Sequence, residues 1–175
     1  MYLISLYFDE QTEEILEKHM KKVAVETGNS YMREKSIPPH LTIAASKELD
    51  EQRFIELVDL QKDKWHQGMV EWVSVGAFMP HVLFLTPVLN EYLHELCVLF
   101  NQMFEQTGEE KMANTYQPFH WIPHTTVARK LSDEQMRKGF QVLQANFQPF
   151  SGMVTEIGLA KSNPYQDIKR WHLDV

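Results

Sequence analysis

The chain has 175 residues, 43% of them hydrophobic, and a formal net charge of −7 at pH 7. This length fits one compact domain, and no stretch approaches the roughly 20 uninterrupted apolar residues of a membrane-spanning helix. The negative charge argues against a protein that grips long duplexes through its overall field, although it leaves room for a local basic site. The single cysteine, Cys97, cannot form an internal disulfide, so we expect a reduced, cytoplasmic protein.

The first half of the chain predicts the order strand, helix, strand, helix, strand. Asp9 is a typical helix N-cap, and Gly28 ends the helix that Asp9 begins. Pro38 and Pro39 mark the entrance of the second strand, because proline cannot donate to a sheet ladder. Gly68 is expected to stop the second helix. The expected elements are residues 1–8, 10–27, 40–45, 50–65 and 69–78.

The second half predicts the same order again. Asn90 and Ser132 are expected to cap its two helices, the first of which ends near Gly108. Residues 109–122 are the least regular segment, and they are long enough to form a functional loop. The expected elements are strand 82–86, helix 90–108, strand 124–129, a helix from 132 that includes Phe140, strand 150–160 with bends at Gly152 and Gly158, and a last strand from about 170 to 175.

Each half contains one copy of the motif Pro-His-x-Thr-apolar-Ala. The first copy carries His40 and Thr42, and the second carries His124 and Thr126. In a strand, the His and the Thr two residues later project to the same side, roughly 6.5 Å apart. The offset between the two motifs recurs for the flanking strands and helices, which indicates a duplicated βαβαβ unit. We therefore expect repeats at about 1–79 and 80–161, an added C-terminal strand, and a pseudo-twofold axis that brings the two motifs face to face.

Two histidines and two threonines around one gap suit acid–base chemistry on a phosphate. One imidazole can be a neutral base while the other is a protonated acid, and the hydroxyls can donate to phosphate oxygens. This scheme requires no metal, and no metal-ligand spacing is apparent in the sequence. A single His-x-Thr is more often a packed strand histidine, but its repetition at equivalent positions favours a catalytic pair of His40 and His124.

The paired motifs in a duplicated protein of this size resemble the 2H phosphoesterase superfamily, and within it the RNA 2′,3′-cyclic phosphodiesterase or 2′-5′ RNA ligase group. The resemblance implies an α+β, bilobal fold with mostly antiparallel sheets lining a central cleft and helices outside. It also implies metal-free opening of a 2′,3′-cyclic phosphate to a 2′-phosphomonoester, with the histidine of the first motif as acid and that of the second as base. By this resemblance His40 is the acid and His124 the base.

The resemblance also extends to residues around the motifs. An arginine often follows the second motif, and Arg129 stands there. Simple strand alternation places it on the face opposite His124, so either a bulge turns it towards phosphate or it is a surface charge. An aromatic residue of the family stacks on the nucleobase, although core packing is the alternative for each candidate. The candidates here are Tyr7, Phe8, Tyr116 and Trp121.

Several alternatives remain open from the sequence. Lys161, Lys169 and Arg170 either flank the cleft or are solvated, and Cys97 is expected to be a core thiol. The expected partner is an RNA end or a small nucleotide, without membrane, metal or cofactor, and the expected state is a monomer. The same site could serve another cyclic or 2′-5′ phosphoester, or belong to a nucleotide-end-binding module that does not turn over.

Overall fold

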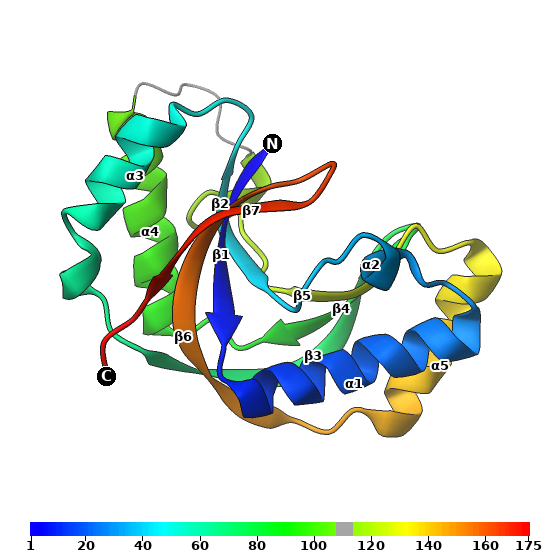
Figure 1. Ribbon diagram of the computed structural model, residues 1–175. Helices are drawn as coiled ribbons and strands as arrows, with labels where there is room; N and C mark the ends of the chain where they lie inside the picture. Colours follow the sequence, from blue (N-terminus) through cyan, green and yellow to red (C-terminus); the bar gives the residue numbers. More distant parts are fainter. Residues whose placement is uncertain (108–113) are drawn as a thin grey trace.

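The computed structural model describes residues 1–107 and 114–175. Its strands form one seven-stranded sheet in which every named pair is antiparallel, and the long helices lie outside the strongly curved sheet (Figure 1). This is the α+β class predicted from the sequence. Within the described part of the chain, none of the helices combines the length and apolar character needed to cross a membrane.

The elements follow the duplicated order expected from the motifs. The first repeat contains β1 (Tyr2–Phe8), α1 (Glu10–Thr27), α2 (Tyr31–Glu34), β2 (Leu41–Ser46), α3 (Glu51–Asp59) and β3 (Gly68–Phe78). The second contains β4 (Val82–Pro87), α4 (Glu91–Gln106), β5 (Thr125–Arg129), α5 (Asp133–Asn146) and β6 (Phe150–Lys161), and β7 (Gln166–His172) is added at the end. Short 3-10 turns lie at Lys62–Lys64 and Asn114–Tyr116.

Side chains at the predicted caps start and end the helices. Asp9 accepts a hydrogen bond of 2.8 Å from the Thr12 amide, and Asn90 accepts one of 3.0 Å from the Leu93 amide. Ser132 forms a capping box at the start of α5, and Gly28 ends α1 in the left-handed conformation with φ 70°. The helix end expected near Gly108 lies outside the described residues.

Other boundaries differ from the sequence prediction for packing reasons. Gly68 begins β3 instead of ending a helix. Only glycine fits at this position, because a Cβ there would lie 2.4 Å from the Tyr92 ring. Gly152 and Gly158 lie inside β6 rather than at bends, since a Cβ would meet Thr12 at 2.3 Å and Tyr7 at 2.6 Å respectively.

Three further expectations are corrected. Helix α3 stops at Asp59 and continues only as a 3-10 turn, and the unpredicted helix α2 occupies part of the polar connection. β7 starts at Gln166 and stops at His172, because the turn before it folds back at once to pair with β6. Helix α5 includes Phe140 as expected, and its side chain is 45% exposed.

The strand order shows how the two repeats are combined. It runs β2-β1-β6-β3-β4-β5, with β7 added beside β6. β1, β2 and β3 of the first repeat are equivalent to β4, β5 and β6 of the second. When each strand is replaced by its equivalent, the same order results in the reverse direction. β1 pairs with β2 of its own repeat and with β6 of the other, while β4 pairs with β5 and with β3. Each half of the sheet is thus built from both repeats.

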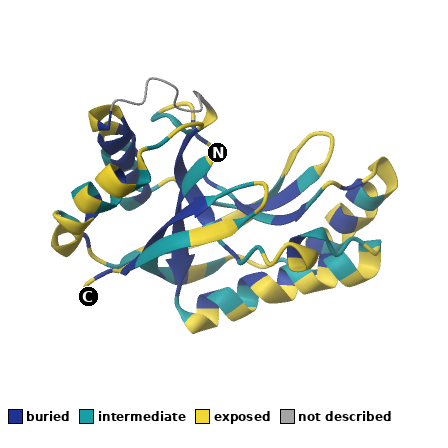
Figure 2. Ribbon diagram, turned by 45° about the horizontal axis from the view of Figure 1, so that its top comes forward, coloured by how far each residue is buried: buried dark blue, intermediate teal, exposed yellow. Residues whose placement is uncertain are grey.

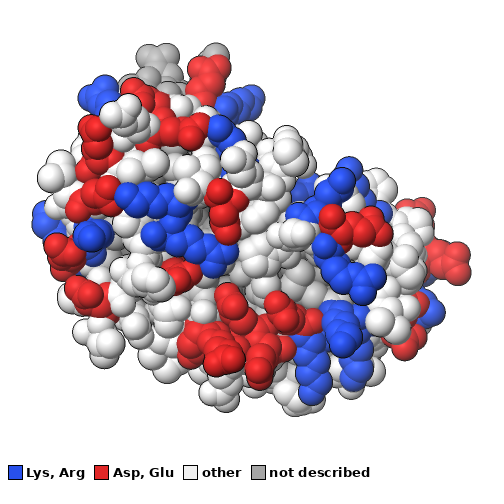
Figure 3. All heavy atoms as spheres, viewed as in Figure 1, with Lys and Arg blue, Asp and Glu red and all other residues white. Residues whose placement is uncertain are grey.

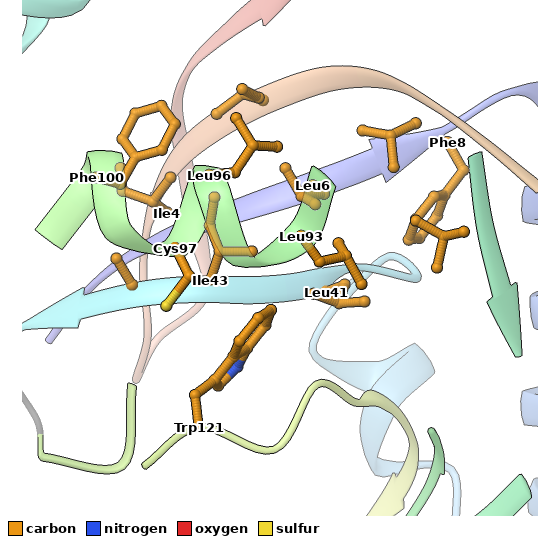
Figure 4. Close-up of a cluster of buried hydrophobic side chains, with 14 of the residues drawn as sticks. Ile4, Leu6, Phe8, Leu41, Ile43, Leu93, Leu96, Cys97, Phe100 and Trp121 are labelled. Carbon is orange, nitrogen blue, oxygen red and sulfur yellow. The ribbon is translucent and has the colours of Figure 1, made fainter. Parts of the chain in front are cut away.

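The helices are exchanged in the same way. α1 packs against α5 and β5, whereas α4 packs against α3 and β2 (Figure 1). The central strands are buried, and the exposed residues lie mainly on outer helix faces, loops and hairpin tips (Figure 2). One hydrophobic cluster joins β1, β2 and α4, and Figure 4 shows Ile43 of β2 between Leu93, Cys97 and Trp121. Side chains of both His-x-Thr strands, β2 and β5, therefore belong to this hydrophobic core.

Candidate active site

Both histidines occupy the same place in their repeats, immediately before a strand. The Nδ1 atom of His40 lies 2.8 Å from the Pro38 carbonyl oxygen, and the Nδ1 atom of His124 lies 2.8 Å from the Ile122 carbonyl oxygen. Since a carbonyl oxygen only accepts hydrogen bonds, Nδ1 carries the hydrogen in both rings. Nε2 is thereby left in each ring as the atom that can take up or release a proton.

A β-bulge follows the threonine in both motifs. In the first, Ile4 pairs with Ala44 and Ser5 with Thr42, so Ile43 has no partner in β1. In the second, Leu83 pairs with Ala128 and Phe84 with Thr126, which leaves Val127 unpaired. The two bulges lie at equivalent positions of the repeats, so they are a shared feature of the motif.

The second bulge decides where Arg129 points. One extra residue between Thr126 and Arg129 reverses the strand alternation, so both side chains face the same side. The two residues accordingly line one cavity of about 360 Å³ together with His124. Its lining residues are Phe78, Val82, Thr115, Tyr116, His120, Ile122, His124, Thr126 and Arg129.

The Arg129 side chain brings unused hydrogen-bonding capacity to this cavity. Its Nε atom is buried and has no hydrogen-bond partner among the described residues. The guanidinium carbon lies 5.7 Å from the centroid of the Tyr31 ring, which holds the group at the wall by a cation–π contact. A buried guanidinium nitrogen that lacks an acceptor suits an anionic ligand.

The threonines of the two motifs have different neighbours. The Thr42 hydroxyl lies 3.1 Å from the hydroxyl of Ser5, its partner on β1, and both residues are buried. The equivalent partner of Thr126 on β4 is Phe84, which offers no hydrogen bond. When Ser5 donates to Thr42, the Thr42 proton is free to point elsewhere. The repeat symmetry is therefore broken at the hydroxyls.

Trp121 joins the approach of the second motif to the strand of the first. Its indole Nε1 donates a hydrogen bond of 3.0 Å to the main-chain oxygen of Thr42. The ring is 6% exposed and packs beneath β2 beside Cys97 and Ile43 (Figure 4). Trp121, predicted from the sequence as a candidate for base stacking, is thus a core residue, and that prediction is corrected.

The pKa of His40 is lowered by burial and by charges of the second motif. Burial lowers the pKa of His40; the Pro38 carbonyl raises it, His124 lowers it, Asp167 raises it and Arg129 lowers it, in decreasing order of effect. Burial also lowers the pKa of His124, against the hydrogen bond to Ile122 that raises it. His124 and Arg129 of the second motif thus both lower the pKa of His40, so protonation of His124 disfavours protonation of His40.

Of the remaining aromatic candidates, one lines the cavity and two are buried in the protein core. Tyr116 lines the cavity, with its ring centroid 6.3 Å from that of His124. Tyr7 is fully buried, and the guanidinium carbon of Arg170 lies 3.7 Å from its ring centroid. Phe8 packs edge-on against Trp72 at 5.0 Å. Tyr116 therefore remains available for a base, whereas Tyr7 and Phe8 do not offer an open face.

The hairpin between β6 and β7 adds residues that the motifs did not predict. The Tyr165 ring lies 6.2 Å from the His40 ring, and its hydroxyl is 2.9 Å from both the Tyr7 hydroxyl and an oxygen of Asp167. Arg170 pairs with Asp167 at 2.8 Å and with Glu156 at 3.1 Å. Nothing in the pattern of residues joined the turn that carries Tyr165 to His40.

The other basic residues of this edge are paired with carboxylates. Lys161 forms an ion pair with Glu51, and Lys169 forms one with Asp59 at 2.8 Å. On the face drawn in Figure 3, basic side chains form several separate groups, with an acidic group at the bottom, and there is no single large basic field. These lysines therefore have carboxylate partners, whereas the buried Nε of Arg129 has no hydrogen-bond partner among the described residues.

Two further sequence expectations concern the single cysteine and metal ligands. Cys97 is a buried core thiol, as predicted, and burial raises its pKa to about 11. Among residues 1–107 and 114–175, no group of three His, Cys, Asp or Glu side chains is placed to hold a metal ion.

Comparison with known families now identifies the class of protein. The family model described as the 2′-5′ RNA ligase superfamily matches residues 28–165, which include both motifs. The chain belongs to the 2′-5′ RNA ligase superfamily. It is a 2H phosphoesterase-type protein, as the paired motifs predicted. No curated protein sequence gives a significant match.

Solved structures share the fold of this superfamily member at low identity. The protein TT0787 of Thermus thermophilus aligns with a TM-score of 0.65 and 16% identity over 98% of this chain and 97% of that chain. A structure described as a phosphoesterase gives 0.61 and 17% over 99% and 98%. E. coli LigT complexed with 3′-AMP gives 0.57 and 18% over 98% and 97%. These similarities cover the whole chain, and at such identities they establish the fold alone.

Proposed function

We propose that the protein is a metal-independent phosphodiesterase that opens 2′,3′-cyclic phosphates at RNA ends or on nucleotides. The observation that carries this proposal is the pair of imidazoles, His40 and His124, each with Nδ1 held by a main-chain carbonyl, and the lowering of the His40 pKa by His124. The complex of E. coli LigT with 3′-AMP, a protein of the same fold, supports a nucleotide as the class of substrate.

The reaction needs one base and one acid at the same time. In the proposed mechanism, Nε2 of neutral His124 takes a proton from water, and the water oxygen attacks phosphorus. The bond between phosphorus and O3′ breaks, and protonated His40 gives its Nε2 proton to O3′. The product is a 2′-phosphomonoester. Attack by a 5′-hydroxyl in place of water would form a 2′-5′ linkage by the same steps.

Because the pKa values of both histidines are lowered, the charge of the bound substrate affects how many protons the two imidazoles carry. Without an anion, burial favours the neutral form of both imidazoles, and His124 further lowers the pKa of His40. A bound phosphodiester carries a negative charge that favours one added proton. Asp167 raises the pKa of His40, which supports the assignment of His40 as the acid. The substrate thus promotes the singly protonated pair that the reaction requires.

The other cleft residues would hold the phosphate oxygens. The Thr126 hydroxyl and the Arg129 guanidinium share the cavity with His124, and the Thr42 hydroxyl is oriented by Ser5. Charge on the non-bridging oxygens grows as water attacks, so donors already in place stabilise the transition state more than the ground state. We assign the same role to Thr42, Thr126 and Arg129.

Turnover of adenosine 2′,3′-cyclic phosphate tests the proposal. We expect the wild type to give adenosine 2′-phosphate, identified by chromatography against the 3′ isomer, with undiminished activity after EDTA treatment. His40→Ala and His124→Ala should each lower kcat by about 10²- to 10⁴-fold, since each loses one proton-transfer group. His66→Ala, at an exposed histidine away from the motifs, is the matched control. Full activity in the double variant would refute the mechanism, and tight binding of the 2′-phosphate without turnover would favour a binding module.

A further inference from the structure

Phe119 is presented to solvent in an unusual conformation. Its side chain is 88% exposed, the largest exposed fraction of any aromatic residue among those described. Its φ angle is 66°, in the left-handed region. A bulky residue there costs on the order of 1–2 kcal/mol relative to the ordinary conformation, and glycine or asparagine would occupy the position more readily. Neither burial nor local backbone preference explains a phenylalanine at this place.

The turn that carries Phe119 is fixed on both sides. The Asn101 side-chain amide donates 3.0 Å to the Tyr116 carbonyl, and the Trp121 indole donates 3.0 Å to the Thr42 carbonyl. Within the turn, the His120 amide donates 3.0 Å to the Gln117 carbonyl. These bonds connect the turn to α4 and β2, so the backbone beneath the Phe119 ring has a defined position.

The turn also borders the cavity that contains His124. Tyr116 and His120, on either side of Phe119 in the chain, both line that cavity. The centroid of the His94 ring lies 4.9 Å from that of Phe119 and backs it from α4. Because the ring is nearly fully exposed, its other face is open. Phe119 is therefore an open aromatic surface at the rim of the proposed phosphate site.

We propose that Phe119 is a stacking platform for the base of the second nucleotide, counted from the reactive end of an RNA strand. This inference rests on the proposed function, which places the terminal nucleotide in the cavity. Proteins bind single-stranded RNA by stacking bases on exposed aromatic rings, and such stacking does not require a basic surface. It is compatible with a chain whose net charge is −7. The preferred substrate is then an oligonucleotide end rather than a free cyclic mononucleotide.

The test compares two substrates in matched variants. The first is adenosine 2′,3′-cyclic phosphate, and the second is the adenosine dinucleotide that ends in the same cyclic phosphate. We expect the ratio of kcat/KM, dinucleotide over mononucleotide, to fall about tenfold in Phe119→Ala, within the range expected for one stacked base. Phe119→Leu should lower the ratio similarly, because it keeps apolar bulk but not the flat ring, and Phe119→Trp should preserve it. Phe140→Ala, at an exposed phenylalanine on α5, should keep the wild-type ratio.

Several results would overturn the inference. An unchanged ratio in Phe119→Ala would do so, and so would an equal fall of the ratio in the control Phe140→Ala. Turnover of the mononucleotide by the wild type tests the proposed function separately. If neither substrate is turned over, calorimetric affinities for adenosine 2′-phosphate and the 2′-phosphorylated dinucleotide give the corresponding ratio. Loss of the dinucleotide preference in Phe119→Ala would still support the platform, and its retention would refute it.

Discussion

The indole of Trp121 donates its hydrogen bond to the main-chain oxygen of Thr42 at 3.0 Å, and this bond ties the two halves of the site together. Trp121 stands three residues before His124, and Thr42 stands two residues after His40. This buried contact between the repeats therefore lies close in the chain to both histidines. The strand order is symmetric between the repeats, and this bond joins the strand of one motif to the approach of the other.

Replacement of Trp121 tests that link. Trp121→Phe keeps most of the apolar ring but leaves the Thr42 carbonyl without its donor, which should lower the free energy of unfolding by about 1–3 kcal/mol. We expect kcat to fall as well, since the distance between the motifs is no longer fixed. Trp171→Phe is the matched control, because that indole donates 2.7 Å to Asp59 outside the cleft. It should lose stability in urea titrations while keeping its kcat, and equal losses of kcat in both variants would argue against a specific link.

The dependence of kcat/KM on pH should reflect the two lowered pKa values. Burial lowers the pKa of both His40 and His124, so the free protein holds its single catalytic proton only below the ordinary imidazole pKa of about 6.5. As pH falls further, both rings become protonated and the base is lost. We expect a bell-shaped profile with its maximum below pH about 6.5, and a kcat profile displaced to higher pH by the bound anion. A kcat/KM maximum well above neutrality would contradict the pKa directions.

Arg129 should affect both binding and titration. Its guanidinium lowers the pKa of His40, so Arg129→Gln should move the alkaline limb of kcat/KM to higher pH. Loss of a charge-assisted hydrogen bond to phosphate should also raise KM by about tenfold or more. Steady-state kinetics over a pH series measures both effects. Arg137→Gln, at an exposed position on α5, should change neither. A rise in KM with an unmoved alkaline limb would show that Arg129 does not affect the pKa of His40.

The hydroxyl pair of Ser5 and Thr42 predicts a smaller effect. Ser5→Ala removes the partner that orients the Thr42 hydroxyl and should lower kcat/KM by about 3- to 10-fold, in line with one neutral hydrogen bond. Ser74→Ala, at an exposed hydroxyl on β3, should have no effect. The same kcat/KM in Ser5→Ala and the wild type would show that Thr42 needs no orienting partner.

The sequence predicted the elements and the site motifs because both depend on local patterns. Helix caps such as Asp9 and Ser132, and the repeated motif around His40 and His124, need only neighbouring residues. The exchange of β3 and β6 between repeats could not be predicted, since alternation along a strand does not specify its partner. A similar limit applied to Arg129, whose direction depends on a bulge in the pairing of β5 with β4.

Burial of aromatic residues was the other limit. Trp121 and Tyr116 stand in the same irregular segment, yet one donates to Thr42 in the core and the other lines the cavity. Tyr165 reaches His40 only because β7 folds back beside β6. Each outcome depends on contacts between segments far apart in the chain, and composition alone contains no signal for them.

A crystal structure with bound phosphate tests the central claim most directly, namely that the two motifs form one phosphate site. We expect a single anion within hydrogen-bonding distance of Nε2 of both His40 and His124, and of the hydroxyls of Thr42 and Thr126. The Arg129 guanidinium should contact the same anion. An anion bound by one motif alone, or two anions held separately by the two motifs, would contradict it.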